Sequence, residues 1–567
     1  MTPNPVRLAL IVIGALIASV AGLWFSAHVQ AGSGTIVETV YFKGQSGANL
    51  RALLFRPENA TAASPAPAIL AIHGYLNSAE MQGNFATEFA RRGYVVLAPD
   101  QRGHGASDAP SFAGGYGAPD ALAYLRSLPF VDRGNIGLEG HSMGGWAVLS
   151  GAAAIPDGYR SVVLEGSSVG APFAPPGTAS FPRNLLVVYA TRDEFGGLMW
   201  GPEAPVRTGA TQKIMTTFGV TQPVQAGRLY GSIAAGNARM LLTPKMVHAW
   251  LHESTAGIAP AVDWFGRTLK GGRAVPADDQ IWPWREAGAA VALVAIPVLI
   301  IGMMGLGFAL LSRGREQLVR AAPAMIAPGR GAVGAMAGLS LVPALLYLPL
   351  AMLSESWIGQ NSLLRQTYSN QFAFWALVSA GLTILSVRIG GRGAAPLTGG
   401  WRSVAAAVFA VATAFVLVLL GDVLGHVDPS WWFITIRPLT LTRCRDFLVY
   451  LPFFLAFAVA SLRALDAARP LDQGSTARAL CVAMATLSGG FILFLAIQYG
   501  VLAARGTLLV AGEGLRTIMA IGFVPMFATV GAFGVMSRRW TGSVLTGGLA
   551  SGLFVTWVLT ATQPIGV

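Results

Sequence analysis

The chain has 567 residues, of which 53% are hydrophobic and only 12% are charged, and its formal net charge is +12. Soluble domains carry roughly 25% charged residues, so this composition excludes an ordinary cytosolic protein, a disordered chain and a collagen-like fibre. The two cysteines, Cys444 and Cys481, exclude a disulfide-stapled scaffold and a cysteine-rich zinc module.

The chain begins with a membrane-anchor signal. Residues 8–25 form an uncharged apolar run, and a bilayer core about 30 Å thick needs roughly 20 apolar residues in a helix. Val29-Gln30-Ala31 is a candidate signal-peptidase site, but the run is long for a signal sequence. We therefore expect residues 1–26 to be an uncleaved transmembrane anchor.

Residues 27–286 read like a soluble domain, because their charges nearly balance at 20 basic and 19 acidic side chains. Short apolar runs typical of strands alternate with helix-like stretches, which predicts a mostly parallel sheet covered by helices on both faces. Ligands of such sheets bind beyond the carboxyl ends of the strands. The predicted strands are 36–42, 50–55, 68–72, 95–98, 136–139, 161–164, 185–189 and 238–242, and the predicted helices are 84–92, 120–127 and 143–154.

Residues 287–567 contain only 26 charged side chains and recurring apolar blocks, which predict an all-α polytopic membrane domain of about eight transmembrane helices. The predicted spans are 287–312, 331–353, 371–389, 403–426, 447–465, 479–503, 515–537 and 542–562.

The charges of the connecting loops predict the orientation, because cytoplasmic loops are rich in Lys and Arg. With the N-terminus inside, the cytoplasmic loops hold 12 basic and 3 acidic residues, against 6 and 4 outside. We therefore expect a multi-pass protein of the cell membrane with an extracytoplasmic soluble domain, whose partner is the lipid bilayer and not a nucleic acid. The cytoplasmic loop charges are Arg313, Arg315, Arg320, Arg330, Arg388, Arg392, Arg402, Arg463, Arg469, Arg478, Arg538 and Arg539, with Glu316, Asp466 and Asp472.

A G-x-S-x-G motif, Gly140-His141-Ser142-Met143-Gly144, follows a predicted strand and precedes a predicted helix. This context is typical of a sharp turn that raises a nucleophilic serine above the sheet, at a helix N-terminus that favours negative charge. A second copy surrounds Ser168, but the prolines that follow it exclude a helix. We predict Ser142 as the nucleophile and Ser168 as a loop residue.

A serine nucleophile needs a base and an orienting acid, which follow it along the chain in this architecture. Only His248 and His252 lie after Ser142 within the domain, and His248 is predicted as the base because it comes soon after a strand. Asp193, just past the predicted strand 185–189, is the predicted acid. His252 stays open as the base, and Glu194 and Glu165 stay open as the acid. The backbone N–H groups of Met143 and Tyr75 are the predicted oxyanion hole.

These segments resemble the α/β-hydrolase superfamily. The resemblance rests on His73-Gly74-Tyr75 and on residues 99–107, 140–145 and 190–193. Within it, residues 131–145 resemble the dienelactone hydrolase, prolyl-oligopeptidase and serine aminopeptidase branches. Dienelactone hydrolases have a cysteine nucleophile where this chain has Ser142. The fusion to a polytopic membrane region resembles bacterial membrane hydrolases.

The resemblance implies hydrolysis of an ester, thioester or peptide bond without a metal or an organic cofactor. It also implies a structural role for Asp100 and Arg102 in the loop after the fourth strand. The expected substrate is a small molecule, a lipid or a peptide. Two alternatives stay open: an acyltransferase with the same triad, and a transporter or sensor whose hydrolase-like domain only binds a ligand.

Polar and apolar side chains elsewhere have two interpretations each. Met199, Trp200, Phe218 and Tyr230 either line an apolar acyl pocket or pack in the core. Asp422 and His426 lie on one helix face and precede a polar segment; this group either pairs internally near the outer interface or forms a polar pocket. Polar segment residues are Asp428, Trp431, Trp432, Arg437, Arg443, Arg445 and Asp446.

Overall fold

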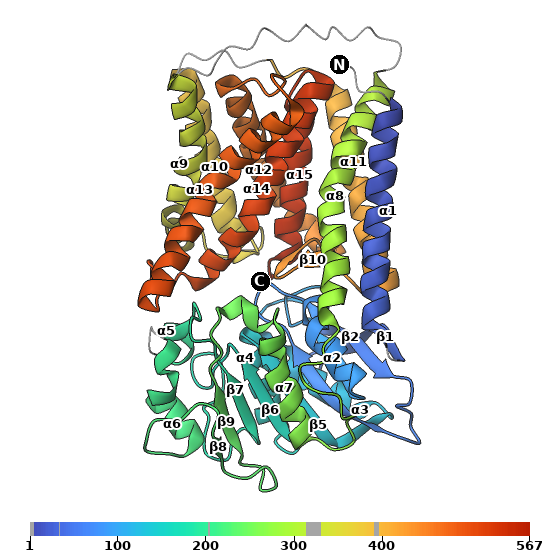
Figure 1. Ribbon diagram of the computed structural model, residues 1–567, viewed down its shortest axis with the longest axis vertical. Coiled ribbons are helices and arrows are strands. Elements are labelled where there is room, and N and C mark those ends of the chain that lie inside the picture. Colours follow the sequence, from blue (N-terminus) through green and yellow to red (C-terminus); the bar gives the residue numbers. More distant parts are fainter. Residues whose placement is uncertain (1–4, 33, 202–204, 313–329, 390–395) are drawn as a thin grey trace.

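The protein consists of an α/β domain and a bundle of long helices that stands on it, as the computed structural model shows (Figure 1). The structure describes residues 5–32, 34–201, 205–312, 330–389 and 396–567. Arg313, Arg315, Glu316, Arg320 and Arg392, which were predicted in cytoplasmic loops, lie outside the described residues.

Within the described residues, nine strands form one sheet in the order β1-β2-β4-β3-β5-β6-β7-β9-β8. The run from β4 through β3, β5, β6 and β7 to β9 is parallel, and β1, β2 and β8 join it antiparallel. The strands are β1 (Thr35–Lys43), β2 (Asn49–Pro57), β3 (Ala66–Ile72), β4 (Val95–Pro99), β5 (Val131–His141), β6 (Ser161–Glu165), β7 (Leu185–Val188), β8 (Leu229–Tyr230) and β9 (Arg239–Leu242).

Helices cover both faces of this sheet, which confirms the predicted architecture. Leu122 of α3 and Leu149 of α4 pack in one core, while Phe85 of α2 and Phe265 of α7 pack in the core on the other face. The eight predicted strands and the three predicted helices are present, whereas β8, α5, α6 and α7 were not predicted. The helices of this domain are α2 (Gly83–Arg91), α3 (Ala118–Ser127), α4 (Met143–Ala154), α5 (Gly196–Met199), α6 (Gln212–Phe218) and α7 (Thr255–Thr268).

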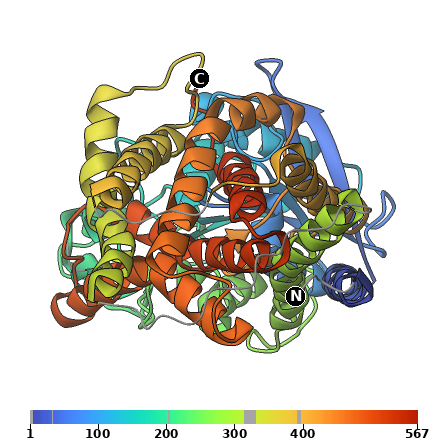
Figure 2. The ribbon, with the colours of Figure 1, turned by 90° about the horizontal axis from the view of Figure 1, so that it is seen from above.

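Nine helices among the described residues are long and apolar enough to cross a membrane, and they match the predicted anchor and the eight predicted blocks. Viewed from above, α1 lies at the edge of the bundle (Figure 2). The helices are α1 (Pro5–Gln30), α8 (Trp282–Leu311), α9 (Arg330–Trp357), α10 (Thr367–Ile389), α11 (Gly400–Gly425), α12 (Leu441–Ala468), α13 (Thr476–Arg505), α14 (Gly514–Thr541) and α15 (Leu545–Thr562).

Most of these helices begin a few residues before the predicted apolar blocks. Helix α12 begins at Leu441, six residues before the predicted start, and Thr440 caps it by accepting a hydrogen bond from the Arg443 amide. The predicted domain boundary at 286/287 lies inside α8, which begins with Pro283 in its first turn. The boundary at 26/27 lies inside α1, which continues to Gln30.

Helix α1 packs along α8 through two glycines. A Cβ added at Gly22 would lie 2.5 Å from the Gly288 carbonyl oxygen, and one at Gly288 would lie 2.7 Å from the Gly22 carbonyl oxygen. Small residues at such a crossing let two backbones approach closely. At the end of α1, the Gln30 side chain donates to the Gly425 carbonyl at 2.8 Å and accepts from Arg285 at 3.2 Å.

Asp422 and His426, at the end of α11, bind the α/β domain, a contact that neither interpretation of the sequence included. Asp422 pairs with Arg51 of β2 at 3.1 Å, and the His426 ring binds the Thr39 hydroxyl of β1 at 3.0 Å. Asp428 and Arg437 do pair with each other, at 3.8 Å. The sequence did not reveal the contacts of Asp422 and His426 with the α/β domain, because partners in a distant segment leave no local pattern.

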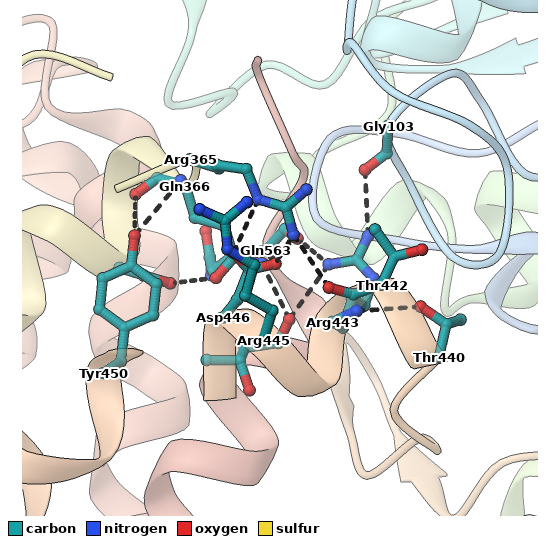
Figure 3. Close-up of polar contacts among 12 residues, drawn as sticks. Gly103, Arg365, Gln366, Thr440, Thr442, Arg443, Arg445, Asp446, Tyr450 and Gln563 are labelled. Atoms are coloured by element: carbon teal, nitrogen blue, oxygen red, sulfur yellow. Dashed lines mark hydrogen bonds and ion pairs between the residues drawn. The ribbon is translucent and has the colours of Figure 1, made fainter. Parts of the chain in front are cut away.

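Arg443 of α12 joins three parts of the chain (Figure 3). Its buried guanidinium donates to the carbonyls of Gly103 at 3.0 Å, Gly105 at 3.1 Å and Thr560 at 3.1 Å, and also to the Gln563 carbonyl. Beside it, Ile565 exchanges backbone hydrogen bonds with the loop after β4, donating to Gly103 and accepting from the Ser111 amide. The helical bundle is thus fastened to the loop that follows β4.

Candidate active site

Ser142 stands on a tight turn between β5 and α4, with φ 56° and ψ −123°. The two glycines of the motif are required by backbone crowding. A Cβ at Gly140 would collide with the backbone of Gly144, and a Cβ at Gly144 would collide with the Ile72 carbonyl. A strained backbone at a strand–helix turn is the geometry of a nucleophile elbow. Ser142 lies half-buried, and it lines a cavity.

His248 and Asp193 are joined by a hydrogen bond of 2.7 Å between the ring Nδ1 and the carboxylate Oδ2. Asp193 follows β7, and His248 begins a short 3-10 helix after β9, so the carboxyl ends of neighbouring strands bring them together. The Asp193 carboxylate also accepts from the Phe195 amide at 2.9 Å. Because Nδ1 faces Asp193, Nε2 is the ring atom left for a substrate-side partner, and His248 lines the same cavity as Ser142.

The electrostatics around His248 favour its charged form. Burial by itself would lower the pKa of the imidazole, but the negative charges of Asp193 and Glu194, with the Asp193 hydrogen bond, raise it above its ordinary value. Such an imidazole is a stronger base than a free histidine. An imidazole in a cleft whose pKa is shifted by a carboxylate partner is typical of a functional site.

The two alternative acids have other contacts. Glu194 accepts the His248 backbone amide at 2.8 Å and the Tyr499 hydroxyl at 2.8 Å, and burial together with the Asp193 charge raises its pKa to about 7. Glu165 is fully buried at the end of β6, where burial raises the pKa of its carboxyl well above the usual range. The structure therefore places Asp193, and neither glutamate, on the His248 ring.

His252 lines the cavity but is bonded elsewhere. Its Nε2 binds the Gln82 side-chain oxygen at 3.1 Å, and its Nδ1 lies 3.3 Å from Glu253. Burial lowers the pKa of His252 to about 4. Both of its ring nitrogens have protein partners, in contrast to His248, whose Nε2 has none among the described residues.

The backbone amides predicted as the oxyanion hole flank Ser142. Tyr75 follows β3 by way of Gly74, and a Cβ added at Gly74 would lie 3.1 Å from the Ser142 Cβ, so this loop passes close to the serine. Met143 is the first residue of α4, where helix amides have no intrahelical partner. Within the described ranges, neither amide donates a hydrogen bond.

The second G-x-S-x-G copy packs against His248 and does not form an elbow. Ser168 is buried, and its hydroxyl accepts from the Trp146 indole at 3.3 Å. Gly166 has φ 56°, and a Cβ there would lie 2.8 Å from the His248 Cε1. Sequence reasoning missed this contact, which makes glycine necessary against the imidazole.

The remaining residues that the sequence analysis discussed in the α/β domain hold loops or pack in the core. Asp100 accepts the backbone amides of Ala79 and Ala106 at 2.9 and 3.0 Å, and Arg102 donates to the carbonyls of Asp108 and Ala109. The four residues proposed for a pocket or the core pack with the core: Met199, Trp200 and Phe218 are buried there, and Tyr230 packs against it.

A cavity extends from Ser142 into the helical bundle. Sequence reasoning missed its helical walls, because an apolar stripe on a membrane helix looks the same whether it faces lipid, protein or a cavity. The lining residues are Gly74, Tyr75, Leu76, Asn77, Met81, His141, Ser142, Phe195, His248, Ala249, His252, Glu253, Phe372, Trp432, Phe433, Ile434, Thr435, Leu515, Ile518, Met519, Gly522, Phe523, Met526, Val558, Leu559, Thr562 and Gln563. In the part of the chain that the structure describes, no three His, Cys, Asp or Glu side chains are grouped to hold a metal.

Residues 67–195 match the family model described as alpha/beta hydrolase fold, and this match supports a hydrolase. Three solved structures are similar at a TM-score of 0.31 each. A hypothetical protein of Pseudomonas aeruginosa is 15% identical over 42% of this chain and 95% of its own. An esterase of Pyrococcus furiosus is 15% identical over 42% and 92%, and an acylaminoacyl peptidase of Pyrococcus horikoshii is 16% identical over 43% and 44%.

The fold can now be assigned from three observations that agree. The sheet is mostly parallel and covered on both faces, a strand–turn–helix carries Ser142, and the family model matches from β3 to the turn after β7. The chain is an α/β-hydrolase-fold domain joined to an all-helical region with several long apolar helices.

Proposed function

We propose that the protein is a membrane-embedded serine hydrolase that cleaves an ester, thioester or peptide bond through an acyl-enzyme on Ser142. The hydrogen bond of 2.7 Å between Asp193 and His248 carries this proposal, because it orients the free ring nitrogen in the cavity that Ser142 lines. The Ser-Asp-His order along the chain matches that of α/β hydrolases.

The first half-reaction acylates the serine. The Ser142 Oγ attacks the substrate carbonyl carbon while His248 Nε2 takes the hydroxyl proton, and Asp193 stabilises the imidazolium that forms. The Tyr75 and Met143 amides donate to the carbonyl oxygen as it becomes negative. The carbonyl then re-forms, the bond to the leaving group breaks, and the leaving group takes the proton from His248.

The second half-reaction removes the acyl group. His248 takes a proton from a water molecule, whose oxygen attacks the acyl carbon. The bond to Ser142 Oγ breaks and the serine recovers its proton from His248, which releases a carboxylic acid. The two halves together consume one water and need no cofactor.

The nine candidate spans and the arginine distribution support the membrane setting. Arg402, Arg463, Arg469, Arg478 and Arg538 lie at or near the ends of helices that point away from the α/β domain (Figure 1). Since basic loops stay in the cytoplasm, we place the hydrolase domain on the opposite, extracytoplasmic side. The bilayer is then the partner of the helical region.

A fluorophosphonate probe tests the nucleophile on the full-length protein in detergent. Ser142→Ala should lose all labelling, and Ser168→Ala, which removes a serine from the second motif, should keep it. Release of the free carboxylic acid from a reporter ester distinguishes hydrolysis from acyl transfer. Equal labelling of wild type and Ser142→Ala would refute the proposed nucleophile.

A further inference from the structure

The cavity at Ser142 continues along one face of α14. Its lining residues on this helix are spaced at intervals of three and one, which places them on a single face. They are Leu515, Ile518, Met519, Gly522, Phe523 and Met526. Eleven residues separate the first from the last, so at 1.5 Å per residue the face extends about 16 Å into the bundle.

The remaining walls of this deep part are apolar as well. Phe372 of α10 and Val558 and Leu559 of α15 line it. The titratable lining residues (Tyr75, His141, His248, His252 and Glu253) belong to the α/β domain, and no Lys or Arg is among the described lining residues. An unbranched hydrocarbon chain suits such a space, because it has no polar groups whose hydration would be lost on binding.

Polar atoms without partners lie where the bundle meets the α/β domain. Trp432, Thr435 and Gln563 line the cavity, and the indole nitrogen, hydroxyl and side-chain oxygen that they carry are buried and have no hydrogen-bond partner within the described residues. Buried polar groups are normally satisfied, so this set is suited to a ligand with neutral hydroxyl or carbonyl groups. None of these three side chains carries a charge that would attract an anionic group.

Resting on the proposed function, we propose that the substrates are neutral esters of long-chain fatty acids, with the acyl chain along α14. The ester carbonyl then lies at Ser142, and the neutral alcohol part faces Trp432, Thr435 and Gln563. Hydrolysis adds one water across the acyl carbon–oxygen bond and releases the fatty acid and the alcohol. The helical bundle is thus part of the substrate site.

Gly522 allows a direct test. A Cβ added at this glycine would meet no atom within 4 Å, and the residue lines the cavity, so a larger side chain would enter the proposed chain path. Gly500 of α13 provides a matched control, because a Cβ there also meets nothing within 4 Å and the residue is not among those that line the cavity. Both glycines are in helices, where a side chain is tolerated.

The experiment compares p-nitrophenyl palmitate with p-nitrophenyl butyrate on the full-length protein in one detergent. Wild type should prefer the palmitate ester in kcat/KM. Gly522→Phe should lower kcat/KM for palmitate at least tenfold and change butyrate less than twofold, with Gly522→Ala intermediate. Gly500→Phe should leave both values within twofold of wild type. Labelling by a short-chain fluorophosphonate at the wild-type rate confirms that each variant is folded.

The two proposals fail in different ways. In one outcome, Ser142 is still labelled and butyrate is still hydrolysed, but Gly522→Phe leaves the ratio of kcat/KM for palmitate to kcat/KM for butyrate unchanged. That outcome would overturn the acyl path and retain the serine hydrolase. An equal loss in Gly500→Phe would overturn it as well, because the effect would not come from the cavity. Absence of Ser142 labelling in wild type would overturn both.

Discussion

Tyr499 of α13 donates a hydrogen bond of 2.8 Å to Glu194, a residue 305 positions away in the sequence. The other carboxylate oxygen of Glu194 accepts the His248 backbone amide at 2.8 Å, and the neighbouring Asp193 binds the His248 ring. A helix of the bundle is therefore linked to the segment that carries the candidate acid and base. We interpret Tyr499 as a positioning residue.

Tyr499→Phe should lower kcat by about three- to tenfold, the effect of losing one hydrogen bond that orients a buried group. It should also raise the pKa of Glu194 further, because the Tyr499 hydroxyl lowers that pKa. The pH profile of kcat reads out this shift, which loss of packing alone would not produce. Tyr347→Phe is the control, since that hydroxyl donates to Arg516 inside the bundle. Equal effects of both changes would contradict the interpretation.

Asp193→Asn should reduce kcat by about 10³- to 10⁴-fold, because an amide stabilises the wrong imidazole tautomer and not the imidazolium. Glu194→Gln, which retains an oxygen acceptor for the His248 amide, should cost much less. Single-turnover kinetics on a reporter ester measure both. A larger loss in Glu194→Gln than in Asp193→Asn would make Glu194 the acid.

Activity should fall as pH decreases, since only the neutral His248 ring can accept the serine proton. The pKa of His248 is raised above 6.5, so the acidic limb of kcat/KM should have its midpoint above pH 6.5. In Asp193→Asn the midpoint should move to lower pH, because the largest interaction that raises this pKa is removed. A midpoint near pH 4, the value of His252, would instead indicate that histidine as the base.

Arg443→Met should destabilise the protein by about 3 kcal/mol or more, because it removes the four hydrogen bonds of a buried guanidinium. Arg445→Met should change stability by less than about 0.5 kcal/mol, since Arg445 is exposed and, among the described residues, its side chain donates only to the Ser362 carbonyl. Thermal melting in detergent measures both. Equal melting temperatures would show that Arg443 does not hold the two parts together.

The orientation in the membrane can be tested by cysteine accessibility. In a background with both native cysteines replaced by serine, Asp263→Cys on α7 should react with an impermeant maleimide in sealed right-side-out vesicles. Thr476→Cys at the start of α13 should react only after permeabilisation, because its helix end points away from the α/β domain. The reverse pattern would place the hydrolase domain in the cytoplasm.

The elements of the protein follow from local features of the sequence. Gly140 is required by crowding against Gly144 within the same five residues, and a long apolar run predicts a helix because the bilayer offers backbone groups no other partner. The parallel sheet follows in the same way from short apolar runs between helices. These features depend on neighbours in the chain, so the sequence alone predicted the α/β-hydrolase fold and the nine spans.

Only the tertiary structure decided which residues meet across the chain. Asp193, Glu194 and Glu165 all lie at strand ends, and the turn after β7 determined which carboxylate contacts the His248 ring. Asp422 found its partner in Arg51, and α14 became a wall of the Ser142 cavity. Each contact joins segments tens to hundreds of residues apart, and a local pattern holds no information about which surfaces pack together.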